Sequence, residues 1–425
     1  MRKPLSIASL SIASPSIASV SIAYIVRDPL PPARADLLTL FGEEMPRHGV
    51  NSEIVGQAGG DSVAAAPWPA GGMHIVGSLR SRFAAILSPL WDLRGLLLAW
   101  RRARPDCIQV RDKIASGLLG RLVAALLGLP FVYWMSFPIV EGFEVRRDQI
   151  GRKGGWRRAP AWFAHAVRAR ASRFVLYRLV LPGACHVFVQ SEAMAAWLAG
   201  QGVDPARMTA VPMGVDAALF DRATVAPSAD PRLDGRRVLI YLGRIALARR
   251  SDFLLDVVAQ LQRAVPEILL VIAGDAASRD ETAWMRAEIA RRGLGGHVLL
   301  TGWLPQRVAL AYAVRAEVGL SPIPRGSLFD VSSPTKLVEY LALGIPSVAN
   351  DIPDQRLVID QSGAGLCVPM EAAAFAQAVR RLLDDPALCT ALSRRGPAYV
   401  RRHRTYAILG RIVAETYTKI LPERR

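Results

Sequence analysis

Short apolar runs that alternate with helical stretches constrain the fold more than any other feature of this sequence. Runs such as Ser21–Val26 and Val238–Leu242 are followed by segments of helical periodicity, among them Ala35–Arg47 and Leu255–Ala264. Strands that alternate with helices in this way pair in parallel, and the helices cover both faces of the sheet. The sequence therefore predicts an α/β protein built on parallel sheets.

A turn-rich polar segment, 222–237, interrupts the alternation, which begins again at Val238. We therefore expect two doubly wound Rossmann-like domains that face each other across a cleft. The predicted organisation is a low-complexity tail, an N-terminal domain, a linker, a C-terminal domain and a final helix, over residues 1–20, 21–221, 222–237, 238–400 and 401–425. Ligands of such sheets bind beyond the carboxyl ends of the strands, so the strand-to-helix junctions are where we expect the site.

The first twenty residues are set apart by an internal repeat. Residues 6–10, Ser-Ile-Ala-Ser-Leu, recur with small changes at 11–15 and 16–20. A secretory signal peptide is one interpretation, since basic residues precede an apolar stretch, but serine recurs throughout and Pro15 interrupts the segment. We favour a slipped-repeat tail. No apolar run of about eighteen residues occurs elsewhere, because Arg121 and Pro130 break 118–134, so no membrane span is expected.

The charge balance is strongly basic, since 53 Lys and Arg against 36 Asp and Glu give a formal net charge of +17. Such a charge favours anionic partners, namely nucleic acid, an anionic membrane surface or a phosphorylated substrate. We find no recognition-helix signature, zinc finger or RNA-binding aromatic strand, which argues against nucleic acid. The 4 cysteines form no Cys-x-x-Cys pair and the 6 histidines no His-x-x-x-His pattern. We therefore expect neither a disulfide scaffold nor a metal site.

A glycine and two arginines follow the predicted strand Val238–Leu242. Gly243 ends the strand, where the lack of a side chain lets another group approach the backbone closely. Arg244 and Arg249 flank the loop that follows, and two guanidinium groups would hold a diphosphate well because each forks onto two oxygens. The alternative is that both are solvated surface arginines.

The segment Ser332–Pro346 carries the marks of a helix with both ends defined: a serine N-cap, a proline in the first turn and a Gly-x-Pro stop. The free amides and positive dipole end of such a helix form an anion site. Lys336 and Glu339 lie three residues apart, hence on one face. The lysine would add charge for a phosphate, and the carboxylate would accept hydrogen bonds from a diol such as ribose. The alternative is a surface Lys–Glu pair.

Two further junctions complete the set. Val211–Asp216 reads as a tight turn near the end of the first predicted domain, and Trp303 follows Thr301-Gly302 at a strand end. We expect Trp303 either to contact a nucleotide base or to plug the hydrophobic core.

Taken in order, these four stretches resemble the family 4 retaining glycosyltransferases of GT-B fold, also called group 1 glycosyltransferases. Ala273–Asp275, Ser362–Gly365 and Val368-Pro369 add to the resemblance, which covers roughly 21–420 and is strongest over about 205–370. Each motif alone is weak, but the ordered set is specific. The resemblance implies an enzyme that moves a sugar from a nucleotide sugar to an acceptor, with retention at the anomeric carbon.

The resemblance also assigns roles. Arg244 and Arg249 would hold the nucleotide diphosphate, Glu339 the donor ribose, and backbone amides around Ser333–Thr335 the phosphates. The last helix would cross back onto the first domain. We predict a catalytic set of Arg244, Arg249 and Glu339, and a donor-binding set of Gly243, Trp303, Ser333, Thr335 and Lys336. No acidic metal motif is evident, so we expect a metal-independent reaction with no cofactor beyond the nucleotide-diphosphate-sugar substrate.

The sequence departs from the family pattern at three places. Arg249 stands where the family usually has lysine, and Val331 stands where it has the first of two glutamates. Asp330 lies one residue away and is a possible substitute. Ser136 occupies roughly the position of a common histidine. The Ser-Pro-Thr-Lys form of the loop resembles a branch that lacks the first acid, so its absence does not imply inactivity.

On the side expected to bind the acceptor, the N-terminal domain, the predicted residues are Asp28, Arg111, Ser136 and Glu141. For Arg111, its neighbour Asp112 and Glu141, a structural role is favoured over catalysis.

The segment 146–178 holds ten basic residues and one acid, Asp148. Its second half mixes arginines with aromatic and apolar residues, which suits a helix lying on an anionic bilayer. The alternative is a solvated basic face beside ordinary core. The membrane interpretation fits relatives that add sugars to lipid-linked or saccharide acceptors.

We thus expect a cytoplasmic transferase, peripheral on the inner face of the plasma membrane, that builds surface polysaccharide or lipopolysaccharide. A nucleotide-sugar epimerase of the same fold and a catalytically inactive membrane-bound scaffold are the alternatives.

Overall fold

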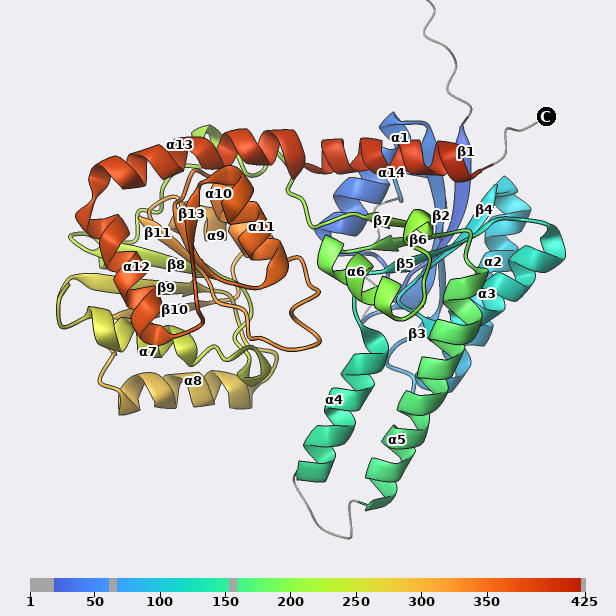
Figure 1. Cartoon of the computed structure of the whole chain (residues 1–425), viewed down its shortest axis with the longest axis horizontal. Coiled ribbons are helices and arrows are strands. Elements are labelled where there is room, and N and C mark those ends of the chain that lie inside the picture. The colour runs from blue at the N-terminus through green and yellow to red at the C-terminus, as the bar shows by residue number, and fades with distance from the viewer. Residues whose placement is uncertain (1–18, 61–66, 153–158, 422–425) are drawn as a thin grey trace, which may run out of the picture.

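The computed structural model of the chain describes residues 19–60, 67–152 and 159–421. Residues 1–18 of the predicted tail and 153–158 of the basic segment lie outside the described residues. Two α/β domains stand side by side, with the N-terminal domain on the right of Figure 1 and the C-terminal domain on the left. The predicted two-domain α/β architecture is confirmed.

The N-terminal domain is built on a seven-stranded sheet of order β3-β2-β1-β4-β5-β6-β7, in which every pair is parallel. Its strands are β1 (Val20–Ile25), β2 (Val50–Ala58), β3 (Met73–Ser78), β4 (Cys107–Arg111), β5 (Phe131–Met135), β6 (His186–Val189) and β7 (Met208–Ala210). Its helices are the π-helix η1 (Asp36–Glu44), α1 (Met45–Arg47), α2 (Ala84–Ala103), α3 (Ile114–Leu127), α4 (Ile139–Arg152), α5 (Ala159–Phe174), the π-helix η3 (Val175–Val180) and α6 (Glu192–Gly200).

The C-terminal domain is built on a six-stranded parallel sheet of order β10-β9-β8-β11-β12-β13. Its strands are β8 (Arg237–Leu242), β9 (Ile268–Ala273), β10 (Val298–Gly302), β11 (Val318–Ser321), β12 (Ser347–Asn350) and β13 (Gly365–Val368). Its helices are the 3-10 turn η8 (Leu247–Arg249), α7 (Phe253–Leu261), α8 (Arg279–Arg291), α9 (Gln306–Ala313), α10 (Thr335–Ala342), α11 (Pro353–Ser362), α12 (Ala372–Asp384) and α13 (Pro386–His403). A last helix, α14 (Tyr406–Ile420), follows.

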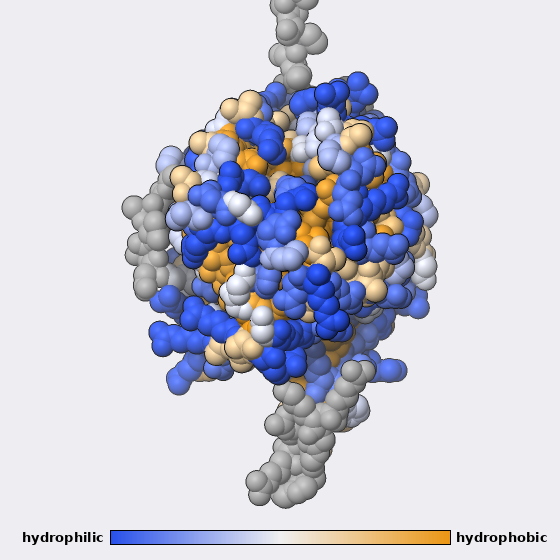
Figure 2. Space-filling model, turned by 90° about the vertical axis from the view of Figure 1, so that its left-hand side faces the viewer, coloured by the Kyte–Doolittle hydropathy of each residue, from blue (hydrophilic) through white to orange (hydrophobic). Residues whose placement is uncertain are grey.

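Alternating residues of the strands build a core on each face of each sheet. In β1, Ile22 and Tyr24 pack with the apolar residues of η1 and α14, while Ala23 and Ile25 pack on the opposite face. This follows from the two-residue side-chain period of a strand. The outer face of the C-terminal domain is covered mostly by polar and charged side chains, between which apolar ones appear in smaller areas (Figure 2).

Both sheets reverse their strand order at one point, between β1 and β4 in the first and between β8 and β11 in the second. The loops that leave neighbouring strands at such a point diverge to opposite faces of the sheet and leave a crevice. The loops after β1, β8 and β11 carry Asp28, Gly243–Arg249 and Ser332–Pro334, while Arg111 ends β4 and Asp112 follows it. The topology thus brings most of the predicted site residues to these crevices.

The predicted linker 222–237 is not a free tether. It contains two 3-10 turns, Arg222–Thr224 and Pro231–Leu233, and Leu233 is buried in the core of the C-terminal domain. Val215 and Phe220, which precede the linker, are buried in that same core. The chain therefore leaves the N-terminal domain before Val215, and turn-forming composition here reflects surface turns rather than a flexible connection.

The chain crosses between the domains a second time where α13 ends and α14 begins. The two helices run along one edge of the molecule and span both domains (Figure 1). Tyr406, Leu409, Val413 and Tyr417 of α14 are buried in the N-terminal core. The C-terminal helix is therefore part of the first domain.

Helices α4 and α5 form a hairpin that projects from the N-terminal domain, at the bottom of Figure 1. Arg173 of α5 pairs with Glu141 and Glu144 of α4 at 3.0 Å, and the Arg168 guanidinium lies 4.4 Å from the Phe143 ring centroid. These contacts hold the two helices together. No helix in the described part of the chain is both long enough and apolar enough to cross a membrane.

Candidate active site

Two adjoining cavities lie at the carboxyl ends of the strands. The C-terminal cavity has a volume of about 490 Å³ and is lined by the loop after β8 and by α10. The interdomain cavity, of about 600 Å³, is lined by residues of both domains. Arg249, Thr335 and Lys336 line both cavities, so the two form one continuous site.

The C-terminal cavity brings together most of the residues predicted for the donor. Its lining includes Gly243, Arg244, Arg249, Thr335, Lys336 and Glu339. The two arginines form no hydrogen bond or ion pair through their side chains with any residue that the structure describes. Their loop is fixed instead by its backbone, since the Ala246 N–H donates to Ser251 Oγ and the Leu247 N–H to Glu281 Oε1. The two arginines therefore present to the cavity positive charge that no ion pair within the described residues neutralises.

Gly243 makes room for Lys336. Its φ of +147° lies in the region that favours glycine, and a Cβ at this position would lie 2.6 Å from the Lys336 Cε and 3.1 Å from its Nζ. The Lys336 ammonium group lies 5.1 Å from the centroid of the Tyr241 ring, where a cation is attracted to the π face. The glycine thus lets the lysine pass over the end of β8 into the cavity.

Glu339 lies one turn beyond Thr335 on the same face of α10 and also lines the C-terminal cavity. Burial raises the pKa of its carboxyl group, while the charge of Lys336 and a hydrogen bond from Thr335 act in the opposite direction. This carboxylate can accept hydrogen bonds from a bound hydroxyl group beside the positive cluster.

The predicted serine N-cap of α10 is wrong. Pro334 is the N-cap residue, and no side chain caps the helix. The Ser333 hydroxyl instead donates to Asp354 Oδ2 at 2.7 Å and accepts from the Met213 N–H at 3.0 Å. Because no side chain occupies the first amides of α10, this end of the helix stays open towards the cavity, as an anion site requires.

Asp330 does not take the place of the missing first acid. Its carboxylate pairs with Arg325, 2.8 Å away, and accepts from the Gly326 N–H. It lines neither cavity. Val331 is buried against the N-terminal core, and its carbonyl oxygen accepts from Ser191 Oγ at 2.7 Å. This residue therefore serves as an apolar contact between the domains.

Trp303 is 74% exposed and lies outside both cavities, so the prediction of a hydrophobic plug is wrong. Contact with a base stays a prediction. The tryptophan follows Gly302 at the end of β10, and Gly302 itself lines a separate cavity beside Asp275 and Arg279.

On the N-terminal side, Asp28 and Ser136 line the interdomain cavity as predicted acceptor residues, together with Asp112. Asp112 takes a left-handed φ of +52° and accepts hydrogen bonds from the backbone N–H and the hydroxyl group of Ser136. Burial raises the pKa of the Asp112 carboxyl, against the opposing charge of Arg111. The predicted acceptor set contains Arg111 and not its neighbour Asp112. The one signal for Asp112 in the sequence is its position directly after a buried strand.

Two other predicted acceptor residues, Arg111 and Glu141, do not line the cavity. Arg111 is fully buried beneath it, with Nη2 2.5 Å from Asp36 Oδ2 and Nε 3.6 Å from Asp28 Oδ2. Glu141 is buried between α4 and η3, where it accepts from Arg173 and from the Tyr177 hydroxyl. Neither lines the interdomain cavity. Both residues have structural roles, because a side chain that faces away from the cavity cannot touch an acceptor.

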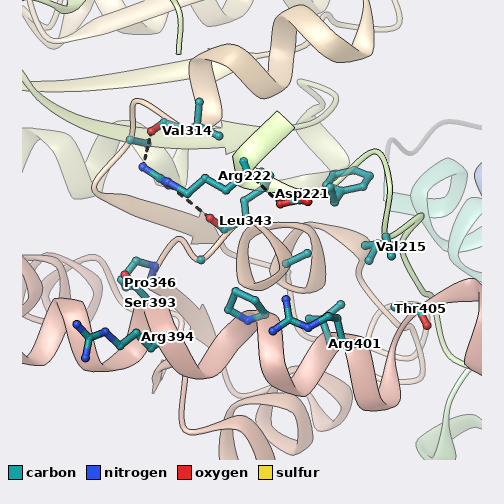
Figure 3. Close-up of a pocket in the computed structure, with 18 of the residues that line it drawn as sticks. Val215, Asp221, Arg222, Val314, Leu343, Pro346, Ser393, Arg394, Arg401 and Thr405 are labelled. Carbon is teal, nitrogen blue, oxygen red and sulfur yellow. Dashed lines mark hydrogen bonds between the residues drawn. The ribbon is translucent and has the colours of Figure 1, made fainter. Parts of the chain in front are cut away.

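A third cavity of about 850 Å³ lies by the amino ends of β11 and β12, beneath α13 (Figure 3). Arg222 spans it and donates to the carbonyl oxygens of Val314 and Leu343 at 2.9 and 3.4 Å. None of the predicted site residues lines it. Nor do the described residues contain a group of three His, Cys, Asp or Glu side chains placed to hold a metal ion.

Two family models match most of the chain. The model described as "Glycosyl transferase 4-like domain" matches residues 38–214. The model described as "Glycosyl transferases group 1" matches residues 236–385 and so includes Arg244, Arg249 and Glu339.

Curated proteins similar to this chain are glycosyltransferases. An alpha-D-kanosaminyltransferase of Streptomyces kanamyceticus is 30% identical over 157 residues, which are 37% of this chain and 39% of that protein. A 2-deoxystreptamine glucosyltransferase of the same organism is 26% identical over 76% of this chain and 82% of its own length. A GDP-mannose-dependent alpha-(1-6)-phosphatidylinositol dimannoside mannosyltransferase of Mycobacterium tuberculosis is 25% identical over 67% of this chain and 66% of its own length. The chain thus spans less than half the length of the first of these relatives.

Among solved structures, HepE of Anabaena in complex with UDP superimposes with a TM-score of 0.67 at 15% identity. The match covers 94% of this chain and 100% of that one, and at such an identity it shows the fold alone. The resemblance inferred from the ordered motifs is confirmed by the two family models and by this fold. The chain belongs to the group 1 glycosyltransferases, family 4, of GT-B fold.

Proposed function

We propose that this glycosyltransferase moves a sugar from a nucleoside-diphosphate donor to a lipid-linked or saccharide acceptor, with retention at the anomeric carbon and without a metal ion. The observation that carries the proposal is the convergence of Arg244, Arg249 and Lys336 on a cavity that the open end of α10 also faces. The solved neighbour with bound UDP supports a nucleotide sugar as the class of donor.

The chemistry follows from where charge develops. As the bond from the anomeric carbon to the diphosphate breaks, the sugar gains oxocarbenium character and the diphosphate gains negative charge. Guanidinium and ammonium groups that are already in place stabilise that charge without reorganising, and so lower the barrier. Arg244 and Arg249 supply forked donors, Lys336 a point charge, and α10 its first amides.

Glu339 would hold the ribose of the donor, because its carboxylate sits beside the diphosphate site and accepts hydrogen bonds from a diol. No carboxylate of the loop 324–334 lines either cavity. The departing diphosphate is therefore the group that we propose to take the proton from the acceptor hydroxyl, on the same face of the sugar.

The acceptor would enter the interdomain cavity from the N-terminal side. Asp28, Asp112 and Ser136 line that side, and carboxylates with a neighbouring hydroxyl suit the recognition of sugar hydroxyl groups. We propose surface polysaccharide or lipopolysaccharide as the pathway. The mannosyltransferase relative, whose name includes a phosphatidylinositol acceptor, supports a lipid-linked acceptor, and the deoxystreptamine glucosyltransferase supports a soluble saccharide.

The hairpin of α4 and α5 is the part that we propose to meet an anionic membrane. On α5, Trp162, Phe163 and Val167 are exposed, with Phe163 at 64%, and Arg168 and Arg170 lie among them. Exposed apolar side chains interleaved with arginines fit the boundary between headgroups and acyl chains. Arg173 does not add free charge, because it pairs with Glu141 and Glu144.

The donor site is tested by calorimetric binding of UDP, GDP, ADP, dTDP and CMP. The wild type is compared with Arg244→Ala and Glu339→Ala, and with Arg380→Ala as a control from the exposed face of α12. We expect one nucleotide to bind, with a loss of about tenfold or more in both site variants and no change in the control. Absence of binding by all five nucleotides to folded protein would overturn the proposal.

The membrane contact is tested by sedimentation with vesicles of phosphatidylglycerol or of phosphatidylcholine. We expect binding to the anionic vesicles alone, and a loss of that binding when Trp162 and Phe163 are both replaced by serine. Val308→Ser, at an exposed apolar position of the C-terminal domain, is the matched control. Equal binding of the double serine variant and of Val308→Ser to the anionic vesicles would count against the hairpin as the membrane contact.

Two alternatives have their own outcomes. Release of an epimerised sugar in the absence of an acceptor would favour an epimerase. Nucleotide binding without turnover of any nucleotide sugar, tested with a panel of acceptors, would favour an inactive membrane-bound scaffold.

A further inference from the structure

The two crossings between the domains meet at one buried point. The Val215 N–H donates to the carbonyl oxygen of Arg404 at 2.9 Å, and the Tyr406 N–H donates to the carbonyl oxygen of Val215 at 3.0 Å. Val215 and Thr405 form a parallel bridge there and lie at one edge of the cavity in Figure 3. The chain that leaves the N-terminal domain and the chain that returns to it are therefore joined backbone to backbone.

Gly214 permits this close approach. A Cβ at this position would lie 2.9 Å from the Arg404 carbonyl oxygen and 2.8 Å from Leu409 Cδ1. The backbone oxygen cannot move away without breaking its hydrogen bond to Val215. The turn Val211–Asp216 thus has a structural purpose, which is to let the first crossing lie against the second.

The Arg404 side chain extends from this junction to the loop before α10. Its Nη2 donates to Asp354 Oδ1 at 2.7 Å, and its Nη1 lies 3.4 Å from Ser333 Oγ. Ser333 in turn donates to Asp354 Oδ2 and accepts from the Met213 N–H. Arg404, Asp354 and Ser333 are each 4% exposed, so the network is shielded from water.

The Ser333 hydroxyl group already uses all of its hydrogen-bonding capacity. A hydroxyl group has one hydrogen to donate and two lone pairs to accept with, and here Asp354 takes the hydrogen while Met213 and Arg404 take the lone pairs. This side chain therefore cannot bind a phosphate. It fixes the backbone just before Pro334 and Thr335, where α10 begins.

We propose that Arg404 is a positioning residue that couples the domain crossings to the anion-binding end of α10. Arg404 lines neither the C-terminal nor the interdomain cavity, so it touches no substrate there. It acts through Ser333 and Asp354, and a shift of the crossings is passed to the first turn of α10. The part of this inference that concerns nucleotide affinity rests on the proposed function.

The test compares Arg404→Lys, which keeps the charge but loses the fork, with Ser333→Ala and the double variant. Arg402→Lys, two residues earlier and exposed, is the control. Hydrogen exchange is measured in the free protein over 210–216 and 329–341, and binding of UDP and GDP is measured by calorimetry. Asp354→Asn, which keeps the shape of the side chain, is used if Arg404→Lys does not fold.

We expect exchange in both segments to rise about tenfold in Arg404→Lys while exchange elsewhere matches the control. The affinity for whichever nucleotide binds should fall by about five- to tenfold, and the double variant should be no weaker than the weaker single variant. Exchange over 210–216 and 329–341 that matches Arg402→Lys would overturn the inference. If the wild type binds neither UDP nor GDP, the five-nucleotide panel decides the proposed function, and the exchange measurement still decides this inference.

Discussion

Replacing Gly243 with alanine perturbs stability and binding by separate and calculable amounts. At φ +147°, alanine is strained by about 1–3 kcal/mol, which lowers the melting temperature of a domain of this size by about 2–12 °C. The new Cβ would also lie 2.6 Å from Lys336 Cε, so the lysine must swing away. Loss of its charge-assisted contact to a diphosphate costs about 1.5–3 kcal/mol, or about ten- to a hundredfold in affinity.

The control for this variant is Gly293→Ala. Gly293 also has a left-handed φ, +67°, but a Cβ there would meet no atom within 4 Å. Thermal melts should therefore show destabilisation in both variants, while calorimetry should show weakened nucleotide binding in Gly243→Ala alone. Equal affinities in the two alanine variants would refute the claim that Gly243 is needed to place Lys336 in the site.

Three further predictions follow from buried charge. Arg111→Met should lower the free energy of unfolding by about 1.5–3 kcal/mol in urea titrations, because the buried Asp36 carboxylate loses one of its two arginine partners and keeps Arg34; an effect below about 0.5 kcal/mol would argue against a buried pair. Burial lowers the pKa of His186 to about 4, so this residue should contribute about 1–3 kcal/mol of stability above pH 6.5 that is lost as the pH falls towards 4. His186→Gln should flatten that part of the stability profile, and an unchanged profile would contradict the assignment. Because burial raises the pKa of Glu339, nucleotide binding should weaken on acidification from a pH above the ordinary range of a glutamate, and Glu339→Gln should remove this dependence while Arg380→Ala keeps it.

The fold and most of the donor side could be predicted because they depend on local patterns. Apolar runs followed by helical stretches define the strands, and the motifs place Gly243 at a strand end, Arg249 in the loop that follows it and Glu339 in a helix after another strand. The rule that doubly wound sheets bind ligands at such ends then brings them together. Strand β3 and helix α2 were not predicted, since Met73–Ser78 is short and interrupted by polar residues, and Pro89 lies inside α2.

The errors arise where tertiary contacts override local preference. The Ser-Ser-Pro sequence favours a serine cap. Asp354 and Arg404 are buried beside Ser333, however, and its hydroxyl group forms hydrogen bonds with both of them instead. Arg111 lies at a strand end, yet its guanidinium group is buried against Asp28 of the loop after β1 and Asp36 at the start of η1. These partners are distant in sequence, so nothing near either residue predicts them.

A crystal structure with bound nucleotide would show whether the nucleoside diphosphate lies at the open end of α10. We expect the diphosphate against Arg244, Arg249 and Lys336, with the ribose hydroxyls on Glu339. A diphosphate found elsewhere, such as in the 850 Å³ cavity beneath α13, would contradict this placement.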